Sequence, residues 1–190
     1  MALSPVALCS RALMKIGAQP IQSFYDDTME AEFSVALFAP IRDALLSAYP
    51  WRFAVSQITL ARLNDAPLAD YQYAYQLPND CLRVLSVGDQ GSSRGVVYRR
   101  VGNTLHTDAE ALILDYIFRP DDETAPPYFE QALMARLAAE FCLPLTENTS
   151  RADMLYRLAN IEFEAAKRID AQQDTPRALN DFSLINARES

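Results

Sequence analysis

The residues of this sequence that could carry out chemistry are few and widely separated. His106 is the only histidine, and no nucleophile on a glycine-flanked turn accompanies it. The cysteines, Cys9, Cys81 and Cys142, include no C-x-x-C pair, so a zinc site of the usual kind has too few ligands. Each cysteine lies in an apolar stretch, which predicts three buried free thiols. We therefore expect neither nucleophilic catalysis, nor a metal centre, nor a bound cofactor.

Two acidic runs, Asp26–Asp27 and Asp121–Glu123, have carboxylates that could instead hold a metal cation. Neither has the alternate-residue spacing of a calcium loop. Both precede expected helices, where carboxylates cap free N–H groups and oppose the positive end of the helix dipole. Capping is the favoured interpretation, and a small metal-dependent enzyme built on Asp121–Glu123 is the less favoured one.

Other candidates also have a simpler structural interpretation. Tyr71, Tyr73 and Tyr75 alternate along an expected strand and could stack bases or sugars, but aromatic rings also favour strands because they pack well. Glutamates on the expected helices, Glu140 among them, are interpreted as solvated side chains rather than as acid–base pairs. No group of residues has the pattern of an enzyme site.

The periodicity of apolar residues predicts an α+β fold in which four helices frame a small antiparallel β insert. The helices are expected at residues 4–17, 28–48, 125–145 and 150–172, and the insert at about 51–119. Pro40 predicts a kink or break in the second helix, and Pro144 the end of the third. Apolar residues at helical spacing predict the core faces, which include Val35 on the second helix. On the fourth helix they are Met154, Leu155, Leu158, Ile161, Ala165 and Ile169.

Composition limits the possible partners. The 190-residue chain has a net charge of −8, which argues against gripping nucleic acid or anionic lipid through a basic face. Among its 17 basic residues only Lys15 and Lys167 are lysines. Arginine is enriched at protein interfaces, so this bias favours protein partners. No signal peptide or membrane span is evident, and we expect a protein made in the cytoplasm.

Five segments carry a resemblance to a known family. They are Leu8–Ile21, Arg42–Ala54 (RDALLSAYPWRFA), Tyr73–Leu85 (YAYQLPNDCLRVL), Leu137–Thr146 and Ala171–Gln173. In this order they resemble the tail tubular protein A family and the related head–tail connector adaptors of bacteriophages and gene transfer agents. The similarity extends from about residue 3 to residue 173.

The resemblance implies a structural protein without catalytic activity. Members form a ring, typically dodecameric, that binds below the portal protein and joins the capsid to the tail while DNA passes through its lumen. The partners implied are the portal, a downstream stopper or tail protein, and further copies of the chain, in the neck of a virion or phage-like particle assembled in the bacterial cytoplasm. A stopper or tail-terminator ring of the same neck is the alternative.

The resemblance also suggests roles for particular residues. Residues 1–173 would form the adaptor domain, and residues 174–190 a tail that docks on the portal. Apolar residues of this tail are the proposed anchors: Leu179, Phe182, Leu184 and Ile185. The family-motif residues are expected to be structural, with Trp51 and Phe53 as packing anchors, Leu77 and Pro78 at a strand end, and Arg83 in an ion pair. An acidic lumen would repel passing DNA and so prevent adhesion.

Overall fold

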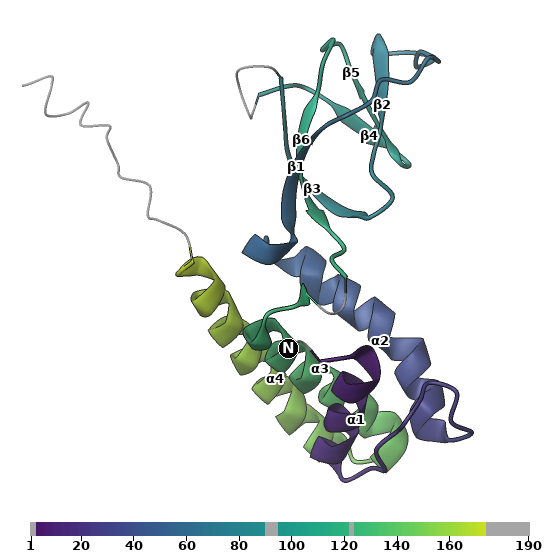
Figure 1. The fold of residues 1–190 in the computed structure, drawn as a ribbon, viewed down its shortest axis with the longest axis vertical. Coiled ribbons are helices and arrows are strands. Elements are labelled where there is room, and N and C mark those ends of the chain that lie inside the picture. The colour runs from purple at the N-terminus through teal and green to yellow at the C-terminus, as the bar shows by residue number, and fades with distance from the viewer. Residues whose placement is uncertain (1–2, 90–94, 122–123, 174–190) are drawn as a thin grey trace, which may run out of the picture.

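The fold was analysed in a computed structural model that describes residues 3–89, 95–121 and 124–173. Four helices form one unit, and two small antiparallel sheets form a second unit that stands on one end of the first (Figure 1). All six strands lie between the second and third helices in the sequence. The predicted α+β class, with helices around a β insert, is confirmed.

Capping side chains mark the starts of the first two helices, and a glycine marks the end of the first. Helix α1 (Pro5–Ile16) is capped by the Ser4 side chain and ends at Gly17, which has a φ of 76° that suits glycine. Helix α2 (Met29–Ala48) is capped by Thr28, whose hydroxyl accepts from the Ala31 amide, and not by the acidic pair before it. Pro40 lies inside α2, which continues through it.

Helices α3 (Pro127–Thr146) and α4 (Thr149–Ala171) form an antiparallel pair after the β insert. Helix α3 begins after Pro126 without a side-chain cap, and it continues two residues past Pro144. Asn148 caps α4 by accepting from the Arg151 amide. The predicted helix ends are thus within about two residues of the observed ones, whereas α3 lacks the side-chain cap that the acidic run before it predicted.

Helix α3 occupies the centre of the helical unit. Its buried residues pack against both α1 and α4, and its other neighbour is α2. The predicted core face of α4 is largely wrong, because Met154, Leu158, Ile161 and Ile169 are exposed. Small residues face α3 instead: Ala152, Ala159 and Ala166 are buried. Small side chains let α4 approach α3 closely, which leaves the larger apolar residues on the outside.

The β insert consists of two three-stranded sheets. In the first, β6 (Ile113–Phe118) pairs with β1 (Val55–Thr59) and β3 (Cys81–Gly88). In the second, β5 (Thr104–Thr107) pairs with β2 (Tyr73–Gln76) and β4 (Arg99–Val101). The turn between β4 and β5 contains Gly102 at a φ of 58°, as the predicted hairpin requires.

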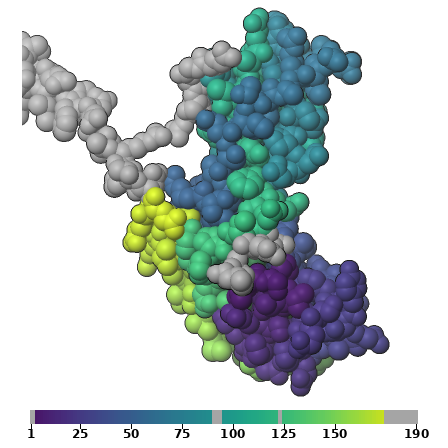
Figure 2. Space-filling model, in the orientation of Figure 1, coloured from purple at the N-terminus to yellow at the C-terminus, as the bar shows by residue number. Residues whose placement is uncertain are grey.

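A separate apolar core holds the insert together. Its buried residues come from both sheets and their connections: Leu60, Tyr75, Leu77, Val87, Leu105, Leu112, Leu114 and Tyr116. The main core of the helical unit is distinct and reaches the insert through Trp51, Ala54 and Ile117. The space-filling view shows the two units as separate bodies joined at a narrow waist (Figure 2). Residues at this waist determine how the β insert is held relative to the helical unit.

Candidate functional site: the junction and the groove beside it

An aromatic cluster centred on Trp51 forms the junction between the two units. Trp51 is fully buried, and the centroids of neighbouring rings lie 5.0–6.3 Å from its own. These rings come from the chain around Trp51 and from α3 and α4: Tyr49, Phe53, Tyr128, Phe129 and Phe163. Large buried aromatic groups contribute strongly to stability. The Trp51 and Phe53 side chains both pack within this cluster.

Two family-motif residues meet at the C-terminal end of α2. The Trp51 indole Nε1–H donates to the carbonyl oxygen of Leu45 at 2.9 Å. The Arg83 guanidinium, from β3, donates to the carbonyl oxygen of Ser47 at 3.0 Å. The last carbonyls of a helix have no partner within it, and a cation is favoured at this end of the dipole. Arg83 thus binds a helix carbonyl where the sequence predicted an ion pair.

Asp170 joins α4 to the same junction. Its carboxylate is fully buried, accepts from the Arg52 backbone amide at 3.1 Å, and accepts from the Tyr128 hydroxyl at 2.8 Å. Burial first, and then the neighbouring Asp170 carboxylate, raise the pKa of Tyr128. Asp170 was not among the residues predicted from the sequence, although it follows Phe163 and Ala166 at helical spacing on the face of α4 that meets α3.

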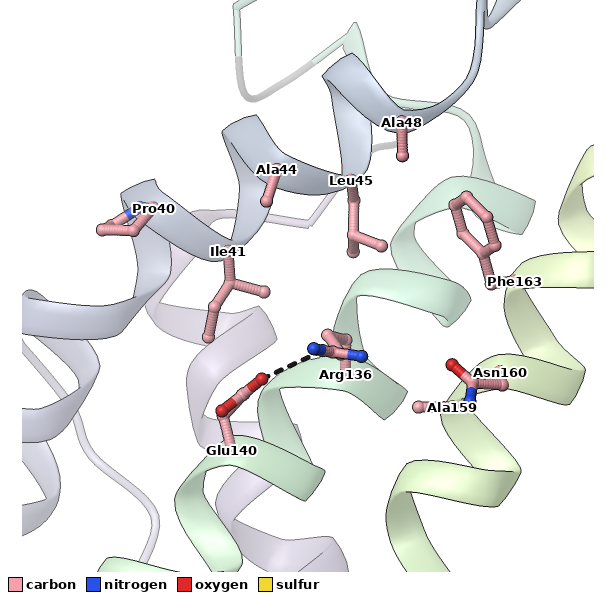
Figure 3. A pocket seen from close by; sticks show the side chains of 10 residues that line it. All are labelled: Pro40, Ile41, Ala44, Leu45, Ala48, Arg136, Glu140, Ala159, Asn160 and Phe163. Carbon is pink, nitrogen blue, oxygen red and sulfur yellow. Dashed lines mark hydrogen bonds and ion pairs between the residues drawn. The ribbon is translucent and has the colours of Figure 1, made fainter.

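A groove of about 420 Å³ opens beside the junction, between α2 and α4 and above α3 (Figure 3). Its walls are mainly apolar, with Ile41 and Leu45 from α2 and Phe163 from α4. Arg136 and Glu140 supply charged groups on its α3 side. Such a groove can receive apolar side chains of another segment.

The charged groups of the groove are already engaged with one another. Glu140 accepts from Arg136 Nε at 3.0 Å and from the Tyr156 hydroxyl at 2.7 Å. Burial, followed by the hydrogen bond to Glu140, raises the pKa of Tyr156 to about 12. The expectation of a merely solvated Glu140 is therefore wrong. Its carboxylate joins α3 to α4 through the Tyr156 hydroxyl.

The remaining sequence candidates lie apart from one another. His106 is on β5, where its Nε2 lies 3.1 Å from the Thr104 hydroxyl. Cys9 and Cys142 are buried in the helical core as predicted, whereas Cys81 is only half-buried at the start of β3. Within the described residues, no three His, Cys, Asp or Glu side chains form a group that could hold a metal ion.

Asp26 of the first acidic run and Tyr75 make hydrogen bonds that stabilise local structure. The Asp26 carboxylate accepts from the amides of Gln22 and Ser23, which shapes the turn before α2. Tyr75 is buried in the insert, and its hydroxyl donates to the Ala109 carbonyl at 2.7 Å. The run Asp121–Glu123 is only partly described, so the interpretation of this run as a cation site stays untested.

The remaining family-motif residues, Leu77 and Pro78, lie just after β2. Leu77 is buried just after β2, and its amide donates to the Asn103 carbonyl, while Pro78 follows it. The anchors proposed for the portal fall outside the described residues: Leu179, Phe182, Leu184 and Ile185. Among the residues that the structure covers, no helix is long and apolar enough to cross a membrane.

A comparison with known protein families found none that matches the chain, and a comparison with curated proteins found no match either.

Proposed function

We propose that this chain is a structural connector subunit that forms a ring between a portal and the tail of a phage-like particle. The observation that carries the proposal is the half-exposed apolar row on α4, where Met154, Leu158 and Ile161 are 48–63% exposed. An apolar row of this kind marks a surface that another protein covers. It supports an assembly subunit over a chain that acts as a monomer.

The architecture of the junction is consistent with this proposal. The segments that resemble connector adaptors supply Trp51 and Arg83, and both side chains bind carbonyls at the end of α2. Their contacts fix the β insert relative to the helices. A ring subunit needs this rigidity, because small angular errors at one subunit accumulate around a closed ring.

Portal docking is proposed for residues 174–190. The full chain and a chain truncated after Gln173 should each be mixed with the cognate portal protein and separated by size. We expect the full chain to co-migrate with the portal and the truncated chain to lose this binding. Equal binding by the truncated chain would refute the role of the tail, and absence of binding by either chain would refute the connector function. A salt-dependent shift of duplex DNA by the chain would instead favour a DNA-binding role.

A further inference from the structure

The exposed apolar residues of α4 form one continuous row, which we call the α4 stripe: Met154, Leu158, Ile161 and Ile169. At 3.6 residues per turn, these four positions fall within an arc of about 80° on one side of the helix. Residues that face α3, such as Ala159 and Ala166, lie on a different side of the helix. The stripe therefore points away from the helical core along the length of α4.

Unpaired positive charges border the stripe on one side. Arg157 and Arg168 each precede a stripe residue by one position, so both lie along the same edge. Both side chains belong to exposed residues, and within the described ranges neither has an ion-pair partner. Glu162 lies along the other edge, and Glu164, on the side of the arginines, is paired with Lys167 at 2.7 Å.

A second unpartnered apolar surface lies on α2 and the turn before it. We call this the α2 surface: Tyr25, Met29, Val35, Ala36 and Ala39. Tyr25 is 97% exposed and the two larger side chains on α2 are more than half exposed. Two hollows of about 630 and 530 Å³ lie beside Phe24 and Tyr25. The hollows and the small residues Ala36 and Ala39 of the α2 surface can thus receive the large side chains of the α4 stripe.

The charges around the α2 surface are opposite to those around the α4 stripe. Asp27 and Glu32 are exposed beside it, and no ion pair engages either one in the part of the chain that the structure describes. Acidic groups here can face Arg157 and Arg168 of another molecule. Two α4 stripes packed antiparallel on each other would instead bring their arginine edges close together, which is unfavourable.

The two surfaces lie on opposite flanks of the helical unit. In Figure 1, α4 forms one side and α2 the other, with α3 between them. The space-filling view likewise shows α4 along one edge and the region of α1 and the start of α2 at the other (Figure 2). Complementary surfaces on opposite sides of a subunit produce head-to-tail association, which closes into a ring when the rotation allows.

From these observations we infer that the α4 stripe of one copy packs on the α2 surface of the next copy. The inference rests on the proposed function, because it supplies the contact between neighbouring subunits of the ring. The partner is a second copy of this chain, and the contact combines an apolar centre with ion pairs from Arg157 and Arg168 to Asp27 and Glu32.

Two variants that each lose one surface test the head-to-tail arrangement. Leu158→Glu with Ile161→Glu places charge in the α4 stripe, and Val35→Lys with Ala36→Lys places charge of the same sign as Arg157 and Arg168 in the α2 surface. Ala44→Glu, in the groove, is the matched control because Ala44 is exposed on the other side of α2. Circular dichroism melting of each full-length variant verifies that it folds. Sedimentation velocity up to about 0.5 mM protein then detects contacts of micromolar or weaker affinity.

We expect the unmodified chain and the Ala44→Glu variant to associate with equal strength. Each double variant should lose at least about tenfold in association constant, because the contact would bury an unpaired charge. An equimolar mixture of the two double variants should form a one-to-one dimer and nothing larger, since one intact surface of each kind remains. That rescue is the result that a head-to-tail contact uniquely predicts.

Three outcomes would overturn the inference. One is an unmodified chain that stays monomeric at the highest concentration. Another is a dimer of the α2-surface variant alone, which would indicate a contact between two α4 stripes. The third is loss of association in Ala44→Glu, which would place the contact in the groove. Portal binding, measured separately, distinguishes failure of this contact from failure of the connector function.

Discussion

The buried carboxylate of Asp170, near the end of α4, accepts the backbone amide of Arg52, just past the end of α2, with 3.1 Å to each oxygen. These residues are 118 positions apart in the sequence. The contact ties the last helix to the first residues of the β insert. Because α4 ends at Ala171, directly before the proposed portal-docking tail, the same residue links the helices, the insert and the origin of the tail.

Removing the Asp170 carboxylate should destabilise the chain. Asp170→Ala leaves the Arg52 amide and the Tyr128 hydroxyl without their buried acceptor, and we expect a loss of about 2–4 kcal/mol in the free energy of unfolding. Tyr128→Phe removes one donor only and should cost about 1 kcal/mol. Urea titration followed by circular dichroism measures both. Equal stability of Asp170→Ala and the unmodified chain would show that this contact does not hold the junction.

The Trp51 hydrogen bond can be tested separately from its packing. Trp51→Phe keeps an aromatic ring but removes the donor to the Leu45 carbonyl, and we expect a loss of about 1–3 kcal/mol. Trp51→Ala also removes most of the ring contacts and should cost about 3–5 kcal/mol. Since Trp51 is the only tryptophan, its fluorescence also reports directly on the junction of the unmodified chain. Fluorescence and circular dichroism should therefore give the same urea midpoint, and a much earlier fluorescence transition would indicate a junction that opens first.

Arg83 should stabilise the end of α2 modestly. Arg83→Ala removes the hydrogen bond to the Ser47 carbonyl and the favourable charge at the helix end, and we expect a loss of about 0.5–1.5 kcal/mol. Arg83→Lys keeps the charge and should recover part of that loss. Urea unfolding of the unmodified chain and of both variants measures these differences in the free energy of unfolding. If the alanine and lysine variants are equally destabilised, the specific guanidinium contact matters and the charge does not.

Alkaline pH should destabilise the fold. Burial raises the pKa of Cys9 from 9.0 to about 12, and burial with the Glu140 hydrogen bond raises that of Tyr156 from 10.0 to about 12. Above pH 9 the unfolded chain therefore loses protons that the folded chain retains, so stability falls as pH rises from about 9 towards about 12. Cys9→Ala should flatten the first part of this decline, as thermal melts between pH 8 and pH 11 would reveal. An unchanged pH profile in Cys9→Ala would contradict this assignment.

The sequence was informative where local chemistry decides the structure. Ser4 and Gly17 determine both ends of α1, and glycine in the turn before Asn103 determines a hairpin. It was misleading on α4, because apolar periodicity identifies a face but not which of two faces lies inside. The large side chains of Leu158 and Ile161 dominate the apolar pattern of this helix, although they lie outside and the small alanines face α3. Long-range contacts such as that of Asp170 with Arg52 depend on the packing of four helices, which no local pattern contains.

We propose that copies of this chain form a ring between portal and tail. The most direct measurement is electron microscopy of purified particle necks from cells that make the chain with a tag at its N-terminus. We expect a tagged ring of this chain directly below the portal, with density for α4 of each copy against α2 of its neighbour. Necks that are complete without the tagged chain, or a tag located elsewhere in the particle, would contradict the proposed ring.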